Sequence, residues 1–181
     1  MNEKIQHTLV IDFETANTSS NSACAVGIVL IRGEEIVESK SFLIRPPTSY
    51  FVFTDIHGLT WDMVKDQMTF KDLFEKELSP LLENAQLMVA HNWSFDRGVL
   101  EGCAKYYGLT LPQLRWECTV RLSRNELGIK PANLSNVCRL LEIPLNHHDA
   151  LSDATASAHI YLYAKTARKL WLEVGQQQRL F

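Results

Sequence analysis

The fold is set by three neighbouring segments, TLVIDFE (8–14), CAVGIVLIR (24–32) and IVESKSFLIR (36–45). Each segment is rich in the β-branched and apolar residues that are typical of buried strands. Gly33-Glu34-Glu35 predicts a tight turn between the second and third segments. Successive strands with short connections pair in an antiparallel meander. We therefore expect three antiparallel strands at the start of the chain.

The rest of the chain alternates helical and strand patterns. Pro46-Pro47 ends the third strand because proline cannot donate to a strand ladder. Two further short strands are expected at 86–90 and 115–120. Spacing and capping residues predict helices over 60–67, 70–83, 94–107, 119–127, 134–141 and 152–170. This order predicts one α/β domain over residues 1–170, with a mixed sheet flanked by helices, and a tail over 171–181.

Composition narrows the classes of function. The chain has 181 residues, of which 46% are hydrophobic, and a formal net charge of −3. These values fit one globular domain and exclude a generally basic coat for nucleic acid. A protein of this charge that handles phosphates needs another counter-charge, for which a bound metal ion is the natural candidate.

Cysteine usage and hydropathy point to an ordinary intracellular protein. The four cysteines include no CxxC pair, so we expect neither a zinc site nor a disulfide framework. No apolar run approaches the roughly 18 residues that a membrane-spanning helix needs. The expected location is therefore the cytoplasm.

Asp12 and Glu14 form the first candidate site. Residues two apart on a strand share a face, so these carboxylates project together from an otherwise apolar segment. Two such charges repel each other, and their desolvation costs about several kcal/mol each. A divalent cation between them would offset both effects. The alternative is that the strand ends here and both side chains meet water.

Asp96 is the second candidate, within the segment AHNWSFDRGVL (90–100). It falls in the first turn of an expected helix that follows a strand, which is where α/β sheets gather their ligands. Asn92 or Ser94 is expected to cap this helix. The alternative is that Asp96 only complements the helix dipole, by about 0.3–1 kcal/mol. We interpret His91 as a structural residue rather than a ligand.

The segment HHDALSDA (147–154) provides the third candidate. Ser152 is expected to cap the last helix, and Asp153 opens it. His148 lies in the preceding loop, from which an imidazole can approach a water molecule while the carboxylate holds a metal ion. The adjacent His147 offers a second register. The alternative is a capping acid beside a solvated histidine.

Together these candidates describe one kind of site. Four carboxylates with no cysteine and few histidines select hard, oxygen-preferring ions such as Mg²⁺ or Mn²⁺. Two such ions about 3.5–4 Å apart catalyse in-line displacement at phosphodiesters. The acid set therefore predicts phosphodiester hydrolysis.

Three segments, DFET (12–15), HNWSFD (91–96) and HDALSDA (148–154), resemble the motifs of the DEDDh family of 3′–5′ exonucleases. That family includes the proofreading subunit of bacterial replicative polymerases, ribonuclease T and oligoribonuclease. The resemblance extends from Thr8 to Lys165. It implies a ribonuclease H-like α/β fold, in which three antiparallel strands are followed by two parallel ones and helices flank the sheet.

The resemblance also implies roles for the candidate residues. Asp12, Glu14 and Asp153 match direct ligands of two divalent ions, and Asp96 matches the fourth acid, which holds its ion partly through water. His148 matches the general base because it has the family's His-x4-Asp spacing to Asp153. His147 misses that spacing by one residue, and a sister subfamily has tyrosine where this chain has an aspartate.

Substrate contacts are implied in the same way. Thr15 and Ala16 match backbone contacts to the terminal sugar, and His57 and Gly58 belong to an Ile-His-Gly loop beside the last nucleotide. Phe95 is a candidate for stacking on a base, which contributes about 1–3 kcal/mol per base. Other aromatic residues have the same two interpretations, stacking or ordinary packing: Tyr50, Phe51, Phe53, Trp61 and Trp93.

The function expected from the sequence is a metal-dependent 3′–5′ exonuclease that releases nucleoside 5′-monophosphates from single-stranded or frayed DNA. The first alternative is the same chemistry on RNA, since discrimination depends on the 2′-hydroxyl. The second is a non-catalytic nucleic-acid-binding adaptor of the same fold. The intact acid set argues against the adaptor.

The C-terminus carries a further motif. Gln177, Leu180 and Phe181 stand as Q-x-x-L-F, which resembles the peptide by which bacterial polymerases and repair proteins dock on the sliding clamp. We expect the last helix to stop near Leu172 and Gly175 to terminate it. The alternative is a Leu-Phe pair that folds back on its own domain.

Overall fold

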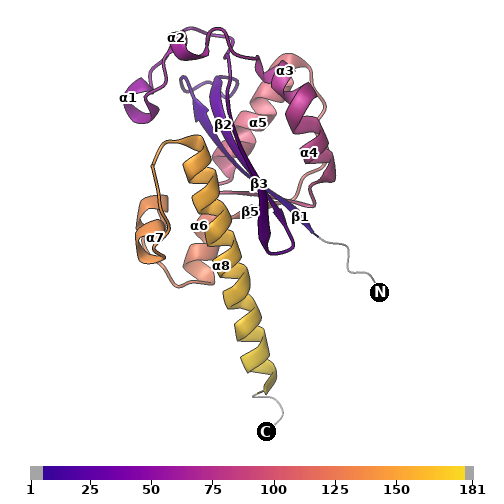
Figure 1. The fold of residues 1–181 in the computed structure, drawn as a ribbon, viewed down its shortest axis with the longest axis vertical. Helices are drawn as coiled ribbons and strands as arrows, with labels where there is room; N and C mark the ends of the chain where they lie inside the picture. The colour runs from indigo at the N-terminus through magenta and orange to yellow at the C-terminus, as the bar shows by residue number, and fades with distance from the viewer. Residues whose placement is uncertain (1–5, 178–181) are drawn as a thin grey trace.

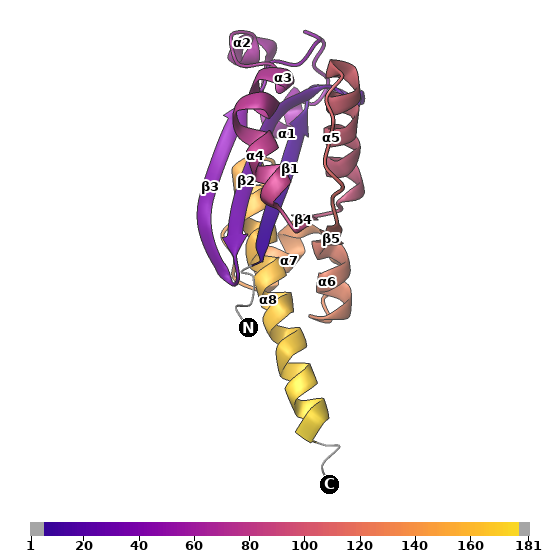
Figure 2. The same cartoon turned by 90° about the vertical axis from the view of Figure 1, so that its right-hand side faces the viewer.

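The computed structural model describes residues 6–177, with side chains described as far as Trp171. Its centre is a mixed five-stranded sheet with the strand order β3-β2-β1-β4-β5 (Figures 1 and 2). The strands are β1 His7–Thr15, β2 Ala23–Arg32, β3 Glu35–Leu43, β4 Leu87–Ala90 and β5 Trp116–Cys118. The first three pair antiparallel, and β4 and β5 continue the sheet in parallel. The predicted α/β fold with three antiparallel strands followed by two parallel strands is confirmed.

β1 is central and sends alternate side chains to opposite faces of the sheet. Leu9, Ile11 and Phe13 pack into one hydrophobic cluster, whereas Val10 packs into another. A strand has a side-chain period of two, so Asp12 and Glu14 share the face of Val10. The two candidate carboxylates are therefore on the opposite side of the sheet from the largest apolar cluster.

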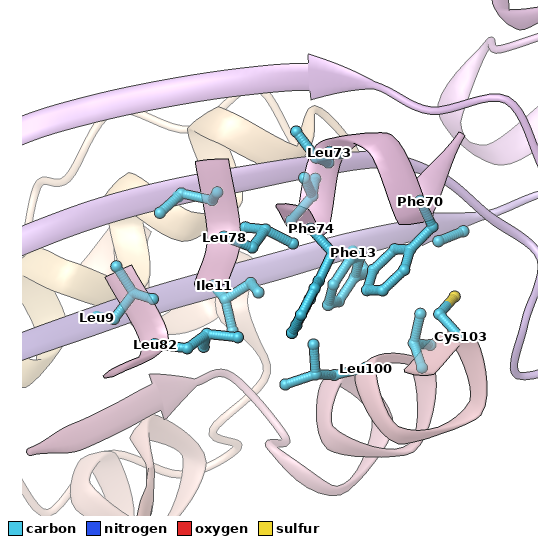
Figure 3. Close-up of a cluster of buried hydrophobic side chains, with 14 of the residues drawn as sticks. Leu9, Ile11, Phe13, Phe70, Leu73, Phe74, Leu78, Leu82, Leu100 and Cys103 are labelled. Atoms are coloured by element: carbon cyan, nitrogen blue, oxygen red, sulfur yellow. The ribbon is translucent and has the colours of Figure 1, made fainter. Parts of the chain in front are cut away.

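One face is covered by a long helical segment and by α5 (Ser94–Tyr107). The segment consists of α3 (Phe70–Leu73), a π-helical turn (Phe74–Leu78) and α4 (Ser79–Asn84). Figure 3 shows its apolar side chains meeting those of β1 and of α5. The sequence predicted a helix over 70–83 with a candidate kink at Pro80. The wider turn directly precedes Pro80, whose missing N–H disturbs regular helical bonding.

The other face is covered by α6 (Thr119–Asn125) and α8 (Ala150–Gln177), and α7 (Leu134–Leu140) packs against α8. α8 lies along the sheet and then continues beyond it, as both views show (Figures 1 and 2). Its contact with Val10 and the neighbouring strand is made largely by small residues, which let the helix approach closely: Ala154, Ala158 and Ala164.

Gly27 in β2 allows the closest approach of α8. A Cβ atom at this position would lie 2.0 Å from the carbonyl oxygen of Ala150 and 2.6 Å from the Cα of Leu151. Only a residue without a side chain fits there, because real Cβ atoms do not approach backbone atoms so closely. The first turn of α8 is therefore held directly against the sheet.

The ends of α8 differ from the expectation. The helix begins at Ala150, and Asp149 caps it by accepting a hydrogen bond from the Ser152 amide at 2.8 Å. Ser152 instead accepts a hydrogen bond from the Asn146 amide at 2.7 Å, so it is not the cap that the sequence predicted. The helix also continues through Gly175 to Gln177, into the segment that was expected to be a tail.

Two other local expectations were wrong. Two short helices, α1 (Thr54–His57) and α2 (Trp61–Val64), form in a region of which only the second part was expected to be helical. α5 has Trp93 at its N-cap, and neither Asn92 nor Ser94 caps it. Within residues 6–177, no helix combines the length and apolarity needed to cross a membrane.

Candidate active site

Asp12 and Glu14 lie in the second half of β1, on the face that α8 covers. Their partners across the β1–β2 ladder are Gly27 and Ala25. Neither partner has a side chain larger than a methyl group, so the sheet beside the two carboxylates stays open. The first turn of α8 occupies this space.

Asp153 comes from that first turn and is 3% exposed. Asp12, Glu14 and Asp153 each offer one oxygen atom, and these atoms all lie within 4.8 Å of one another. Asp153 Oδ2 accepts hydrogen bonds from His147 Nδ1 at 2.8 Å and from the His148 amide at 3.2 Å. Its other oxygen, Oδ1, is buried and has no hydrogen-bond partner among the described residues.

Asp96 reaches the same strand from the opposite helical layer. It lies in the first turn of α5, is 1% exposed, and accepts a hydrogen bond from the Phe13 amide at 2.9 Å. Phe13 stands between the two carboxylates of β1, so Asp96 is held directly beside them. Asp96 is not part of the group of three carboxylates that lie within 4.8 Å.

Burial and crowding raise the pKa of every carboxyl group in this cluster. Burial raises the pKa of Glu14 to about 7, and the charges of Asp153 and Asp149 add to the effect. Burial also raises the pKa of Asp96 to about 8, although its amide hydrogen bonds oppose this. The pKa of Asp12 lies well above its ordinary value because of burial and then the charge of Asp96.

Opposing effects act on the pKa of Asp153, and the net result is a raised value. Burial raises this pKa, and the hydrogen bonds from His147 and the His148 amide lower it in part. These donors favour the charged carboxylate, which prepares the group to act as a ligand.

The cluster fits divalent metal ions. Carboxylate oxygens are the ligands that hard cations prefer, and a buried group of them is stable as anions only beside a counter-charge. The unpartnered Oδ1 of Asp153 is the observation that favours an ion, because a buried polar atom ordinarily has a partner. Asp12, Glu14 and Asp153 are the residues placed to hold it, with Asp96 adjacent.

His147 and His148 lie beside Asp153 and use different atoms to contact it. The His147 ring donates to the carboxylate through Nδ1, whereas His148 contacts it through its backbone amide. The two rings stack, with centroids 3.9 Å apart. His148 has a positive φ of 70°, which turns its backbone amide toward Asp153 and leaves its ring free of that contact.

These groups open into a cavity of about 700 Å³. Asp12, Glu14, Asp153 and both histidines line it. Asp96 is too deeply buried to reach its wall. The site therefore consists of a carboxylate cluster at the base of an open cavity with two imidazoles at its edge.

Hydrogen bonds of the His57 ring connect α1 to the end of β1. Its Nδ1 accepts a hydrogen bond from the Leu59 amide at 3.0 Å, so the proton of the neutral ring is on Nε2. Nε2 lies 3.1 Å from the carbonyl oxygen of Thr15 and donates to it. Both ring nitrogens are thus used within the fold, although His57 and Thr15 line the cavity.

The other residues expected to contact substrate are placed differently. Phe95 is 48% exposed and lines the cavity together with Phe53. Ala16 is fully buried, and its amide and carbonyl group bond to Ser22 and Val52. Gly58 is the left-handed C-cap of α1, with φ of 75°, and is not part of the cavity wall.

Most of the remaining aromatic residues pack against other side chains of the fold. Phe51 and Trp61 contact a small apolar cluster beneath α2, and Trp93 stacks on Trp116 with a centroid distance of 6.2 Å. Tyr50 is 67% exposed and lies outside the cavity. In the expected clamp-docking motif, Leu180 and Phe181 lie outside the described residues, and Gln177 is the last residue of α8.

Sequence reasoning missed the far end of the cavity, which is formed by α6 and the loop before α7. Val120 and Arg124 line it from α6, and His91 lines it from the end of β4. The His91 ring is held by Thr119 Oγ1 at 2.8 Å, and burial lowers its pKa to about 4, so the ring is neutral. The available signal was the four-residue spacing of Val120 and Arg124, which places both on one helical face.

Known proteins share this sequence and fold. The exonuclease family RNase T matches residues 9–161. The PolC-type DNA polymerase III of Caldanaerobacter subterraneus subsp. tengcongensis is 33% identical over 85% of this chain and 11% of its own length. The 3′–5′ exonuclease DinG of Bacillus subtilis is 32% identical over 87% of this chain and 17% of its own length. The chain thus spans less than a fifth of either relative.

A solved structure has the same architecture. The nuclease domain of 3′hExo, a DEDDh family member bound to rAMP, superposes with a TM-score of 0.76. The two chains are 17% identical, and the match covers 92% of this chain and 94% of that one. Together, the matched family over residues 9–161 and the shared fold show that this chain belongs to the exonuclease family and has a ribonuclease H-like fold.

Proposed function

We propose that this chain is a metal-dependent 3′–5′ exonuclease that hydrolyses the last phosphodiester bond of a strand and releases a nucleoside 5′-monophosphate. The observation that carries the proposal is the convergence of Asp12, Glu14 and Asp153 within 4.8 Å at the base of the cavity. A relative, the 3′–5′ exonuclease DinG, and a structural neighbour, the DEDDh nuclease domain of 3′hExo, support the same chemistry.

Two divalent ions, Mg²⁺ or Mn²⁺, are the proposed cofactors. Asp12, Glu14 and Asp153 would hold them, with Asp96 as the fourth acid. When bound, such ions activate the attacking water and neutralise charge on the phosphate and the leaving oxygen. The carboxylates would place these ions at the base of the cavity, and the positive charge there would offset the repulsion between the carboxylates.

His148 is the proposed general base. The His148 backbone amide donates a hydrogen bond to the Asp153 carboxylate. This bond fixes the position of His148, while its ring remains available at the cavity wall. The ring can take the proton of the attacking water and pass it to solvent, because His148 is exposed. The His147 ring is already bonded to Asp153 and is proposed to hold that ligand in place.

The proposed substrate is the 3′ end of a single strand or of a frayed duplex. Phe53 and Phe95 line the cavity and can stack on the terminal bases, and Ile56 is an exposed apolar side chain beside them. DNA is favoured because two relatives of this chain are a DNA polymerase and the exonuclease DinG. RNA is the second candidate because the 3′hExo domain was solved with rAMP.

A strand-shortening assay tests the proposal. A single-stranded DNA labelled at its 5′ end is incubated with Mg²⁺ or Mn²⁺, in parallel with an RNA of the same sequence. We expect a ladder of shortened products and nucleoside 5′-monophosphates from DNA, and none with Asp153→Asn. A strand whose 3′ end is blocked should stay intact. Shortening from the 5′ end would contradict the proposed polarity, and no shortening of either strand would contradict the proposal and favour the adaptor.

A further inference from the structure

The cavity extends beyond the carboxylate cluster toward a second wall. The base of the cavity is formed by β1, by the start of α8 and by the α1 loop, where His57 is fixed to Thr15. The opposite wall is formed by α6 and by Pro131, Ala132 and Leu134, which lead into α7. The second wall has no assigned role in the proposed reaction, although it belongs to the same open space.

Arg124 is the charged group of this wall. α6 starts directly after β5, and its first residue, Thr119, is buried and bonded to the His91 ring. Val120 and Arg124 are one helical turn apart and both face the cavity. The start of α6 is therefore fixed, and the helix presents Arg124 to the cavity from a rigid element.

Arg124 differs from the other lining residues in charge. Of the described residues that line the cavity, it alone is a lysine or arginine. Within the described part of the chain, it takes part in no ion pair and no side-chain hydrogen bond that would neutralise it. By contrast, Arg97 and Arg168 form ion pairs with Glu101 and Glu126. A guanidinium without a protein partner, at the wall of a cavity for a polyanion, is suited to bind phosphate.

The chemistry of the substrate indicates which phosphate this is. The 3′-terminal nucleotide carries only one phosphate, the scissile one, and the carboxylate cluster must hold it. Any second phosphate in the cavity belongs to the strand that remains after cleavage. We infer that Arg124 binds the phosphodiester immediately 5′ of the scissile one and positions the retained strand. This inference rests on the proposed exonuclease function. It specifies which phosphate of the strand lies beside Arg124 when the scissile phosphate lies at the carboxylate cluster.

The inferred contact has a defined kinetic consequence. Arg124 does not touch the reacting atoms, so its loss weakens binding of the retained strand and raises KM more than it lowers kcat. A dinucleotide without a 5′-phosphate lacks the phosphate that Arg124 would bind. For the native chain, a dinucleotide should therefore be a poorer substrate than a trinucleotide. For a variant without the guanidinium, the dinucleotide and the trinucleotide should be equally good substrates.

The test is a cycle of two protein forms and two substrates. The substrates are a DNA trinucleotide and the same trinucleotide with a neutral methylphosphonate at the linkage 5′ of the scissile bond. The proteins are the native chain and Arg124→Gln, with Arg124→Lys as the conservative variant. Arg121→Gln is the matched control, because Arg121 is exposed on the same helix and does not line the cavity.

We expect the methylphosphonate to lower kcat/KM of the native chain and of Arg121→Gln by roughly tenfold, the scale of one charged hydrogen-bonded contact. Arg124→Gln should show a similar loss on the natural trinucleotide and no further loss on the methylphosphonate. Arg124→Lys should restore part of the activity, because it keeps the charge without the planar fork. Equal sensitivity to the methylphosphonate in Arg124→Gln and in the native chain would overturn the inference.

The plain dinucleotide separates this inference from the proposed function. Hydrolysis of the dinucleotide by the native chain requires only the carboxylate cluster, and Arg124→Gln should hydrolyse it at the native rate. A large loss of dinucleotide hydrolysis in Arg124→Gln would also overturn the inference, because the effect would not depend on the second phosphate. Failure of the native chain on every substrate would instead contradict the exonuclease function.

Discussion

Asp12 and Gly27 are direct partners across the β1–β2 ladder, and the absent side chain of Gly27 is the space into which α8 fits. The carbonyl group of Ala150 occupies the position that a Cβ atom would need. Asp153 follows within the same turn of α8. The distance between the carboxylates of Asp12 and Asp153 therefore depends on a glycine that has no chemistry of its own.

Gly27→Ala should separate the two halves of the site. A Cβ atom 2.0 Å from the Ala150 oxygen must push the start of α8 away from the sheet. Overpacking of this kind costs about 1–3 kcal/mol, and we expect a comparable loss of stability together with a large loss of hydrolysis. Chemical denaturation and single-turnover hydrolysis would measure the two effects.

Gly98→Ala is the matched control for that substitution. Gly98 lies within α5, and a Cβ atom there would meet no atom within 4 Å. Alanine is the better helix former by about 0.5–1 kcal/mol, so this variant should be slightly more stable and fully active. A fully active Gly27→Ala would show that the close approach of α8 does not position Asp153.

His148→Ala should lose far more activity than His147→Ala. A positioned general base contributes about 10²–10⁴-fold, and the His148 ring is the one that is not bonded to Asp153. His147→Ala removes one hydrogen bond to Asp153 Oδ2 and should cost roughly tenfold or less. Rates at saturating metal concentration would compare the two variants. Equal losses, or a larger loss at His147, would move the assignment to His147.

The stability of the metal-free protein should fall as the pH rises. The pKa of Glu14 is raised from 4.5 to about 7, and that of Asp96 from 3.8 to about 8. Between the unfolded and folded pKa values the native state binds more protons, so stability decreases with increasing pH. This contribution is fully present below about pH 4 and is lost as the pH passes through about 7 and 8.

Melting curves in a chelator from about pH 5 to about pH 9 would measure this slope. Glu14→Gln should flatten it, because the substituted side chain does not titrate. Saturating Mg²⁺ should also flatten it, because the ion binds the deprotonated carboxylates. A melting temperature that rises with pH in the chelator would mean that the carboxylates are not protonated in the folded protein.

Asp12→Asn should abolish hydrolysis and stabilise the metal-free fold. Asp12 has the charges of four other carboxylates around it, those of Asp96, Asp153, Glu14 and Asp149, and removal of its own charge relieves that repulsion. At about pH 8 without metal, we expect the melting temperature to rise by about 2–4 °C, which corresponds to roughly 1 kcal/mol for a chain of this size. Differential scanning calorimetry and the strand-shortening assay would give the two readings.

Loss of hydrolysis is also expected for Glu14→Gln, Asp96→Asn and Asp153→Asn, and for the native chain in excess EDTA. Added Mg²⁺ or Mn²⁺ should restore only the native chain. Asp66→Asn provides the control, because Asp66 is an exposed carboxylate away from the cavity. Native turnover in any of the four acid variants would remove that residue from the assigned set.

The sheet could be predicted because its signals are local and strong. Apolar β-branched runs identified the first three strands, the two short strands were expected at 86–90 and 115–120, and the position of Asp12 and Glu14 two residues apart placed both on one face. The helix that carries Asp96 was predicted with the bounds that the structure has. Each of these features depends on residues that are close together in sequence.

The remaining features depend on contacts between distant segments. The early start of α8 follows from capping by Asp149 and from packing against Gly27, which no helical periodicity reveals. α1 is a short helix that His57 fixes to β1 through the Thr15 carbonyl group. Arg124 was missed for the same reason, because the cavity that it lines exists only after α6 has packed beside β4.

The two ends of the chain supply the two halves of the carboxylate cluster. Asp12 and Glu14 are in the first strand, and Asp153 is in the last helix. During synthesis, the strand is complete long before the helix has been made, so a growing chain has no assembled centre and cannot cut nucleic acid. The same holds for any fragment that ends before α8. Nuclease activity would thus appear only once the whole domain has been made and α8 has packed against the sheet beside β1.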